Sequence, residues 1–394
     1  MATVRATGTG DTRWVLPALV VGEFRRHPAI TRSRLAATLG LSSSSATDLM
    51  GRLEAARLVA EVPLPAGTRG RPKHRLVPHP EGPVVAVVDV QRGTWRLAVG
   101  TLDGRLHETS DHRYGSASAP AVLDDVRGRL HALRERYGTR LRGIGVSVAG
   151  VVRDGRVADS SMLRWNGIDL QALGVDGVPV IVDNDATLAA IADTVREGAP
   201  GSRTTVHVTI EAGLGGGLID RGAPVVGATG AGAEFGHLPF GDPAVRCPCG
   251  AYGCWGTELD GHALARALGE PEPDDPRRYM EQVIGRAAGD RAAQEAVERA
   301  ARALARGIAG LANALDPDLV TLGGLAVPLH AASVTFDDAY RRGLMGFRRQ
   351  SPPEIVPAEC HRDAALRGAA HRLWDQIATP GGLSAWARTV AATP

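Results

Sequence analysis

The chain has 394 residues, of which 44 % are hydrophobic and 22 % are charged, and this composition excludes global disorder and a collagen-like structure. No apolar run approaches the roughly 18 residues of a membrane span, and residues 1–11 lack the apolar stretch of a secretory signal, so we expect a cytoplasmic protein with no membrane partner. The net charge of +2 on its own argues against a protein that binds nucleic acid.

The positive charge, however, is concentrated near the N-terminus. Residues 1–80 hold 12 basic and 5 acidic side chains, whereas the rest of the chain holds 33 basic and 38 acidic side chains. Such a separation predicts a basic module attached to an acidic body. We therefore expect a DNA-binding domain at 1–80 and a ligand-sensing domain at 81–394, with lobes at 84–190 and 191–370 and a returning C-terminal helix.

The basic module carries the pattern of three short helices followed by a hairpin. Apolar residues at helical spacing predict a helix over 13–27. A second short helix ends at Gly40, and Ser42 is a suitable N-cap for a third. Strands at Val59–Pro63 and Arg75–Val77 then flank a basic tip. Two short helices joined by a glycine turn and followed by a basic hairpin are typical of a winged helix-turn-helix domain.

The third helix is the expected recognition helix. Its first turns present hydroxyl side chains where such a helix meets base edges and phosphates. The tip at 67–73 is the expected wing, and phosphate contacts would supply most of the binding energy. The alternative is an ordinary helical cap with a solvated arginine loop. The predicted DNA contacts are Arg32, Ser43, Ser44, Ser45, Thr47, Arg52, Arg69 and Arg71.

After the proline-rich linker at 78–83, strands alternate with helices, which indicates an α/β architecture. Polar residues and glycine turns follow the strands, at the positions where ligands of α/β folds usually bind. The predicted strands are Val84–Val90, Trp95–Thr101, Leu141–Val148, Val178–Val182, Thr205–Ile210 and Leu319–Leu322, and the predicted helices are Ala119–Tyr137, Ala186–Glu197 and Ala292–Leu315.

One group of residues points to a metal. His237, Cys247, Cys249 and Cys254 supply one imidazole and three thiolates, the donor set of a closed tetrahedral zinc site. Four protein ligands leave no position for an activating water, so a structural zinc ion is expected. The alternatives are three buried thiols or a disulfide, and a disulfide is disfavoured in a chain without an export signal.

At these residues the sequence resembles the ROK family of repressors, open reading frames and kinases, over nearly its whole length. The resemblance rests on GIGVSVAGVV at 143–152, VDNDATLAA at 182–190, GATGAGAEFGH at 227–237, CPCGAYGCW at 247–255 and DPDLVTLGGLA at 316–326. It implies a two-lobed, actin-like sugar-kinase fold with a ligand cleft between the lobes. A winged N-terminal module with Gly70-Arg71-Pro72 resembles the repressor branch of the family.

The resemblance also implies roles for individual residues. Asn184 and Asp185 match the sugar-binding Asn-Asp pair, whose Asp is the catalytic base of the kinases. Glu234 and His237 match a segment in which both side chains contact sugar hydroxyls. The alternative is that Asp183–Asp185 only cap the following helix. Asn166, beside Trp165, is a further candidate for the cleft.

Three departures from the family pattern bear on function, two of them at the phosphate loops and one at the sugar site. Gln91 and Arg92 occupy glycine positions of the first phosphate loop, and Glu211 begins the second, where its carboxylate would repel a triphosphate. ATP binding and catalysis are therefore not expected, and Asp185 is a degenerate base position. Gly256 stands where the family has a sugar-binding Glu, so the effector is expected to be an unusual or weakly held sugar, a phosphosugar, or no sugar at all.

Together these features predict a sugar-responsive transcriptional regulator, a repressor rather than an activator. It would bind a double-stranded DNA operator with two half-sites as a homodimer or homotetramer. One alternative is an ATP-dependent sugar kinase that also binds DNA, which Asp185 and Gly323-Gly324 favour. Another is a ligand-independent regulator whose cleft is purely structural.

Overall fold

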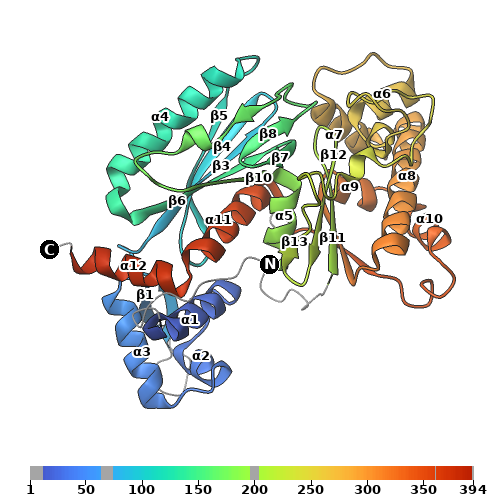
Figure 1. Ribbon diagram of the computed structural model, residues 1–394. Helices are drawn as coiled ribbons and strands as arrows, with labels where there is room; N and C mark the ends of the chain where they lie inside the picture. The colour runs from blue at the N-terminus through green and yellow to red at the C-terminus, as the bar shows by residue number, and fades with distance from the viewer. Residues whose placement is uncertain (1–11, 64–73, 196–203, 360, 393–394) are drawn as a thin grey trace.

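The computed structural model describes residues 12–63, 74–195, 204–359 and 361–392. Two lobes lie side by side, and a small helical module at the N-terminus lies beneath them (Figure 1). A 3-10 helix (η1, Thr12–Trp14) opens the module, and further 3-10 turns are η2 (Gly138–Arg140), η3 (Gln171–Leu173) and η6 (His361–Asp363). None of the described helices combines the length and the apolar character needed to cross a membrane.

The N-terminal module consists of three helices and an antiparallel strand pair. The helices are α1 (Val15–Arg26), α2 (Arg32–Thr38) and α3 (Ser43–Ala55), and the strands are β1 (Val59–Pro63) and β2 (His74–Pro78). Thr31 and Ser42 cap α2 and α3 by accepting hydrogen bonds from backbone N–H groups. Phe24, Leu53 and Leu76 are fully buried between these elements. This is the predicted winged-helix arrangement; the predicted wing tip at 67–73 lies outside the described residues.

The first lobe is built on a five-stranded sheet with the order β10-β6-β3-β4-β5. Its strands are β3 (Val84–Gln91), β4 (Thr94–Gly100), β5 (Leu106–Arg113), β6 (Leu141–Val148) and β10 (Val180–Asn184). The central run of β3 is buried on both faces: Val84, Ala86 and Val88 pack with α4 (Ala119–Tyr137), while Val85 and Val87 pack with α11 (Ala364–Ile377). A three-stranded sheet of β7 (Val151–Arg153), β8 (Arg156–Asp159) and β9 (Ile168–Asp169) lies beside it.

The second lobe holds another five-stranded sheet, with the order β13-β12-β11-β14-β15. Its strands are β11 (Thr204–Ile210), β12 (Leu214–Asp220), β13 (Ala223–Pro224), β14 (Leu319–Gly324) and β15 (Glu354–Pro357). Trp255 is fully buried against the long helix α8, where its indole N–H donates to the Ala303 carbonyl. The helices of this lobe are α6 (Gly261–Leu268), α7 (Pro276–Arg286), α8 (Arg291–Leu315), α9 (Ala326–Ala331) and α10 (Phe336–Gly343), with 3-10 turns η4 (Phe235–His237) and η5 (Trp255–Glu258).

Two helices connect the parts. Helix α5 (Asp185–Thr194) lies where the lobes meet, and α11 crosses it so closely that a Cβ on Gly368 would fall 1.8 Å from the Leu188 carbonyl oxygen. The last helix, α12 (Pro380–Ala391), continues from α11 along the N-terminal module (Figure 1).

The fold prediction, a winged-helix N-terminal part followed by a two-lobed α/β body, is confirmed. The helix predicted over Ala186–Glu197 begins one residue earlier, because Asn184 is its cap, and ends at Thr194. Glu197 itself lies outside the described residues. The small β7–β9 sheet was not predicted, because its strands are too short to show an alternating pattern.

Candidate functional site

A pocket of about 110 Å³ lies between the lobes, where several strands end. It lies against the carboxyl ends of β3, β8 and β10 and against the turn between β11 and β12, the usual ligand position of α/β folds. Its lining residues are Gln91, Ala149, Gly150, Val151, Asp159, Ser160, Ser161, Met162, Asn184, Asp185, Thr209, Glu211, Gly213, Leu214, Gly215, Glu234 and His237.

The carboxylate of Asp185 is hydrogen-bonded to Gln91, which the resemblance places at a glycine position of the first phosphate loop. The Gln91 amide Nε2 donates to Asp185 Oδ2 at 3.0 Å and to Asp89 Oδ1 at 3.2 Å, and Ser147 donates to the same Asp89 oxygen at 2.6 Å. Burial raises the pKa of Asp185 to about 7, and the neighbouring Asp89 carboxylate adds to this effect. Gln91 thus occupies one oxygen of the Asp185 carboxylate, on the side that lines the pocket.

Asn184 lines the pocket, but both ends of its amide are already bonded within the protein. Its Oδ1 accepts from the Thr187 N–H at 2.9 Å and so caps α5, and its Nδ2 donates to the Gly150 carbonyl at 3.1 Å. Asn184 therefore has the role that the alternative interpretation gave it, namely to cap the following helix. The structure does not bring Asn166 to the pocket: this residue is exposed and absent from the lining, while the neighbouring Trp165 is buried in the core of the first lobe.

The turn between β11 and β12, which the resemblance matches to a phosphate loop, is filled by its own acidic residue. Glu211 pairs with Arg277 of α7, which also pairs with Glu281. A Cβ on Gly324 would lie 2.6 Å from Glu211 Oε1, so this carboxylate occupies the space between the two glycine turns. A nucleotide phosphate placed there would meet a carboxylate instead of open backbone N–H groups.

No carboxylate replaces the one missing at Gly256. Glu258 accepts from the Asp242 N–H at 3.1 Å and is not among the residues that line the pocket. A Cβ on Gly256 would lie 3.2 Å from the Gly236 carbonyl oxygen, so the backbone here packs closely against the segment that carries Glu234. Glu258 therefore does not replace the carboxylate that the family pattern has at the position of Gly256.

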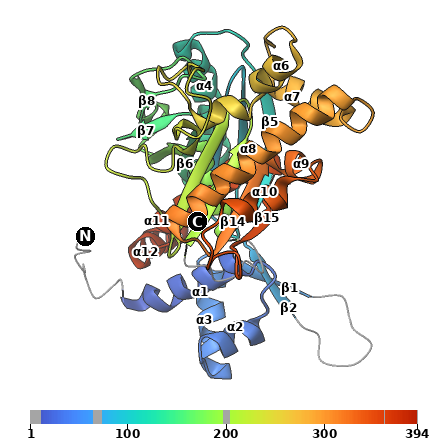
Figure 2. The ribbon, with the colours of Figure 1, turned by 90° about the vertical axis from the view of Figure 1, so that its right-hand side faces the viewer.

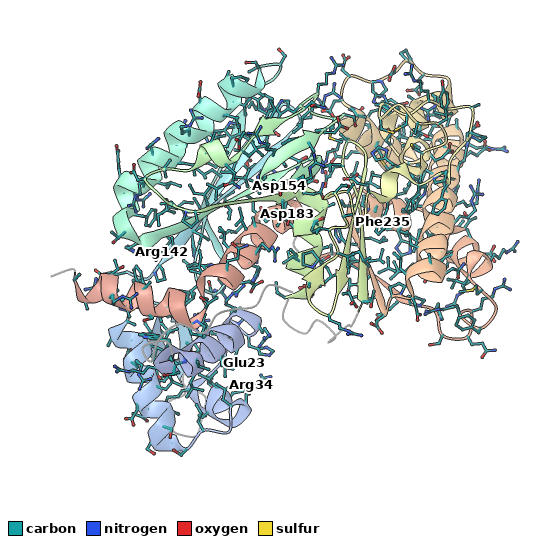
Figure 3. The ribbon with its side chains drawn as sticks, in the orientation of Figure 1. Glu23, Arg34, Arg142, Asp154, Asp183 and Phe235 are labelled. Carbon is teal, nitrogen blue, oxygen red and sulfur yellow. The ribbon has the colours of Figure 1, made fainter. Side chains whose placement is uncertain are left out.

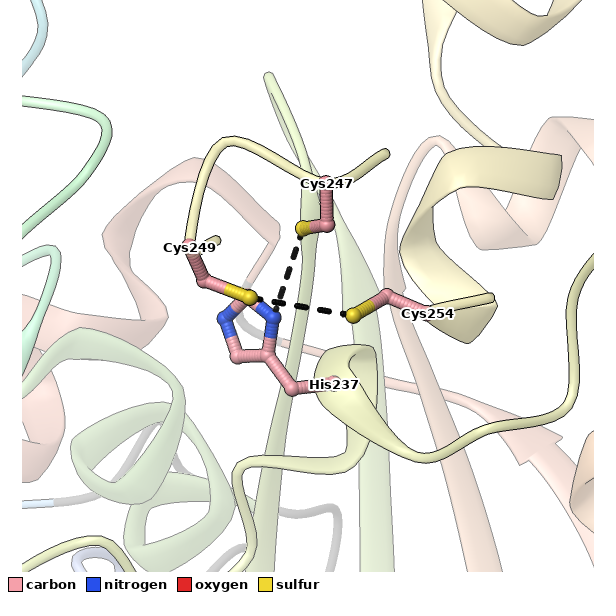
Figure 4. Close-up of side chains that lie close together, drawn as sticks. All are labelled: His237, Cys247, Cys249 and Cys254. Atoms are coloured by element: carbon pink, nitrogen blue, oxygen red, sulfur yellow. Dashed lines mark hydrogen bonds between the residues drawn. The ribbon is translucent and has the colours of Figure 1, made fainter. Parts of the chain in front are cut away.

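The four predicted metal ligands come together, with their donor atoms all within 4.8 Å of one another (Figure 4). Cys247 Sγ lies 3.7 Å from His237 Nδ1, and Cys249 Sγ lies 3.7 Å from Cys254 Sγ. Zinc–sulfur bonds in a tetrahedron place two sulfurs about 3.8 Å apart, whereas a disulfide needs about 2 Å. The cluster is therefore compatible with a four-coordinate metal ion and not with a disulfide.

His237 connects the cluster to the pocket. Its Nδ1 faces the thiols, while its Nε2 lies 3.9 Å from Glu234 Oε2. Glu234 is largely buried, and burial raises the pKa of its carboxyl. An ion in the cluster would fix the His237 ring and with it this wall of the pocket.

In the N-terminal module the predicted contacts that the structure describes lie on α3, except Arg32, which begins α2. Ser43, Ser44, Ser45 and Thr47 are all exposed, although the Thr47 hydroxyl donates to the Ser43 carbonyl at 2.9 Å. Arg52 donates to the Arg13 carbonyl at 3.1 Å, and Arg32 lies 3.5 Å from the Glu61 carboxylate. Arg69 and Arg71 lie outside the described residues.

The module is joined to the body by α11 and α12. The buried guanidinium of Arg25, on α1, donates to the Asp375 carboxylate at 2.8 Å and to the His371 carbonyl at 2.7 Å. The Trp386 indole N–H donates to the carbonyl of Ala56, which ends α3, at 2.7 Å.

Side-chain packing extends this junction to the first lobe. The Arg142 guanidinium of β6 lies 5.9 Å from the centre of the Trp386 ring, at the junction with α12 (Figure 3). In the second view the module lies beneath the lobes, with β1 and β2 on the side opposite α12 (Figure 2). The core of the module is continuous with that of the first lobe.

Comparison with known sequences identifies the family. The sequence model of the ROK family matches residues 86–376. The chain belongs to the ROK family. A kanosamine kinase of Amycolatopsis mediterranei is 33 % identical over 67 % of this chain and 87 % of its own length, and a xylose repressor of Bacillus subtilis is 23 % identical over 79 % of this chain and 82 % of its own.

A solved ROK structure shares the whole fold. It is described as a ROK family transcriptional regulator and homologue of the E. coli MLC protein, and it is 22 % identical over 97 % of this chain and all of its own, with a TM-score of 0.74. The ROK family thus includes both kinases and regulators, and the resemblance seen in the sequence is confirmed.

Two groups of residues in this ROK chain were not found from the sequence. Asp159 and Met162 line the pocket, and the end of a strand at Asp159 was a signal that could have indicated them. Arg25, Asp375 and Trp386 form the junction, but their partners lie more than 300 positions away, so no local pattern marks them.

Proposed function

We propose that this ROK chain is a DNA-binding transcriptional repressor, not an enzyme, whose interlobe pocket takes a small-molecule effector and whose metal cluster holds a structural zinc ion. One observation carries the proposal: a winged-helix module is built onto a ROK body in which Gln91 and Glu211 occupy the phosphate loops. The solved ROK regulator with the same overall fold and the xylose repressor among the relatives support it.

The side chains in the phosphate loops argue against phosphoryl transfer. Gln91 donates to Oδ2 of Asp185, the carboxylate that matches the catalytic base of the family's kinases. Glu211 fills the space beside Gly324 and places negative charge where phosphates would have to sit. Phosphoryl transfer depends on positioned phosphates and on stabilising their charge, so both changes remove what the reaction needs.

A sugar kinase that also binds DNA is the second candidate. The observation that favours it is Asp185 itself, whose pKa of about 7 suits a general base. An ADP-release assay over a panel of sugars separates the two candidates. We expect no turnover above the rate without protein; turnover that Asp185→Asn abolishes would establish the kinase.

Zinc in the cluster would be held by His237, Cys247, Cys249 and Cys254. Four protein ligands complete a tetrahedron, so the ion would join η4 to the 247–254 loop without supplying a reactive water. The His237 ring then places its Nε2 toward Glu234, which keeps the pocket wall in position.

Operator contacts are assigned to the outer face of α3 and to the wing. The hydroxyls of Ser43, Ser44, Ser45 and Thr47 would make short contacts to base edges and phosphates, and Arg69 and Arg71 would contact phosphates or the minor groove. To reach the DNA backbone, Arg32 would have to break its ion pair with Glu61, and Arg52 would have to break its hydrogen bond to the Arg13 carbonyl. A homodimer or homotetramer would place two such modules on two half-sites.

A continuous set of contacts supports a response to the effector. Asn184 lines the pocket and caps α5, which packs closely on Gly368 of α11. Helix α11 in turn holds Arg25 of the module, and Trp386 of α12 holds the end of α3. Movement of α5 on ligand binding would therefore change the position of the recognition helix.

The test is to recover genomic DNA fragments bound by the full-length, zinc-loaded protein. We expect the bound fragments to share a repeated half-site, and their affinity to fall with added salt. If folded, zinc-loaded protein recovers no fragment above background, the proposal is wrong.

A further inference from the structure

The expected recognition helix, α3, presents an acidic side chain where it would meet DNA. Residues 43–51 contain no lysine or arginine, and Asp48 is their only charged residue. In both views α2 and α3 reach the end of the molecule that lies farthest from the two lobes (Figures 1 and 2). DNA is a dense array of negative charge. A carboxylate on this surface therefore opposes binding unless it accepts a hydrogen bond from the DNA.

Asp48 lies on the outer face of α3, opposite the side chains that hold the helix in the module. Ser44, Asp48 and Gly51 are all exposed, and their spacing of four and three residues places them in one row on the helix surface. No other part of the protein would lie within 4 Å of a Cβ on Gly51. The row thus leaves room for a base pair beside Asp48. The buried side chains of the helix are Ala46, Leu49, Met50 and Leu53.

Hydroxyl groups next to Asp48 are already bonded within the helix. Ser42 Oγ, which caps α3, lies 3.0 Å from Ser44 Oγ. The Thr47 hydroxyl donates to the Ser43 carbonyl at 2.9 Å. Each of these hydroxyls can still accept, but it has less freedom to choose a partner on the DNA than an unbonded side chain has.

An ion pair within the helix would be the ordinary use of a carboxylate at this position. Arg52 lies four residues after Asp48, at the spacing at which such pairs form. Its guanidinium instead donates to the Arg13 carbonyl at 3.1 Å. Within the described part of the chain, no hydrogen bond or ion pair holds the Asp48 carboxylate. Its accepting capacity is therefore open to a partner outside the protein.

The chemistry of the major groove decides which base suits this side chain. A carboxylate only accepts hydrogen bonds, whereas guanine presents two acceptors and thymine one acceptor and a methyl group. The amino group of adenine lies between two acceptors, its own N7 and the O4 of the paired thymine. The amino group of cytosine has an acceptor on one side only, the O6 of the paired guanine. Cytosine is therefore the base that offers a carboxylate a hydrogen bond with the least repulsion.

We propose that Asp48 is a specificity-determining residue, which accepts a hydrogen bond from the 4-amino group of a cytosine in each half-site and weakens binding to DNA that lacks this cytosine. The inference rests on the proposed function, since it names a base that the recognition helix reads. A hydroxyl tolerates several bases because it both donates and accepts. The Asp48 carboxylate is repelled by phosphates and by groove acceptors, so it lowers the affinity for non-specific DNA and increases discrimination.

The test is selection of sequences from a random DNA library by the full-length, zinc-loaded protein, followed by titration of single base changes. Half-sites selected by the wild type should contain a cytosine that Asp48→Ala does not require. Changing that C·G pair to T·A should weaken wild-type binding about tenfold or more and the binding of Asp48→Ala less than about threefold. The affinity of Asp48→Ala for a scrambled fragment should rise about twofold or more, because a repulsion is lost.

Two further variants separate base reading from a general effect of charge. Glu54→Gln removes a carboxylate that is exposed in the last turn of the same helix, and it should keep the requirement for cytosine. Asp48→Asn puts an amide at the reading position. Because an amide can bond to both N6 and N7 of adenine, the selected base should change from cytosine toward adenine.

The inference is overturned if Asp48→Ala selects the same bases as the wild type, if the position that it ceases to read is not a cytosine, or if Glu54→Gln loses the cytosine as well. Folded Asp48→Ala protein that binds no DNA also overturns it, since the affinity for scrambled DNA should rise. Wild-type protein that selects no sequence refutes the proposed function and this inference with it. A selected half-site that Asp48→Ala reads unchanged refutes this inference alone.

Discussion

The ion pair between Arg25 and Asp375 joins the N-terminal module to α11, and its two partners differ in exposure. The Arg25 side chain is 9 % exposed and the Asp375 side chain is 57 % exposed. Asp375→Asn leaves a buried guanidinium without its charge partner, whereas Arg25→Met leaves a carboxylate that water can solvate. The two substitutions should therefore have unequal costs.

The magnitudes follow from this asymmetry. Removing one partner of a fully buried pair costs about 3–5 kcal/mol, and the half-exposed partner here reduces the expected cost of Asp375→Asn to about 2 kcal/mol. Arg25→Met keeps the apolar stem of the side chain and loses the hydrogen bonds to Asp375 and to the His371 carbonyl. We expect its cost to be about 1 kcal/mol.

The assay is hydrogen exchange of the amides of α1 in the full-length protein, which reports the free energy of local opening. Arg26→Met is the control, because Arg26 is 62 % exposed and pairs with Glu23 on the same helix. It should cost less than about 0.5 kcal/mol. If Arg25→Met lowers the protection of α1 more than Asp375→Asn does, or if neither lowers it, burial of Arg25 does not hold the module in place.

Three further predictions concern the metal, the wing and the pocket. Cys249→Ser should release zinc and lower the unfolding temperature, with Cys360→Ser as control, since Cys360 is the one cysteine of the sequence that the predicted metal site does not use; an unchanged unfolding temperature would contradict a structural ion. Arg71→Ala should weaken DNA binding and reduce the salt slope by about 1, and an unaltered slope would remove Arg71 from the phosphate contacts. Burial raises the pKa of Asp185 to about 7, above its value of about 4 in an unfolded chain, so this residue contributes stability that is complete below about pH 4 and lost as pH rises through 7. Asp185→Asn should therefore flatten the fall in unfolding temperature between about pH 4 and pH 7; an equal fall in both proteins over this range would contradict the raised pKa.

Local sequence patterns were sufficient to predict most of the helices and strands and the ligands of the metal cluster. The helix Ala119–Tyr137 and the strand Leu141–Val148 have the predicted bounds, because both are regular and long enough to show their periodicity. The three cysteines lie within eight residues of one another and His237 only ten residues before the first, so chain connectivity alone brings the four ligands close.

Contacts between distant segments were not predictable in the same way. That Gln91 obstructs a loop was visible in the sequence, but its bond to Asp185 joins residues 94 positions apart and depends on the pairing of β3, β6 and β10. The acidic lining of the pocket has the same origin, since its four carboxyl groups come from four segments that only the fold brings together. Asn166 does not line the pocket, although the sequence suggested it. Trp165 packs into the core of the first lobe and Asn166 stays exposed, and the sequence alone does not show which way either side chain points.

The central claim is that this ROK chain reads a DNA sequence, and the ratio of two affinities tests it most directly. Full-length, zinc-loaded protein is titrated, at about 0.15 M salt, against a recovered genomic fragment and against a scrambled fragment of equal length and base composition. We expect the recovered fragment to bind about a thousandfold more tightly than the scrambled fragment, or better. Equal affinity for the two fragments would contradict it.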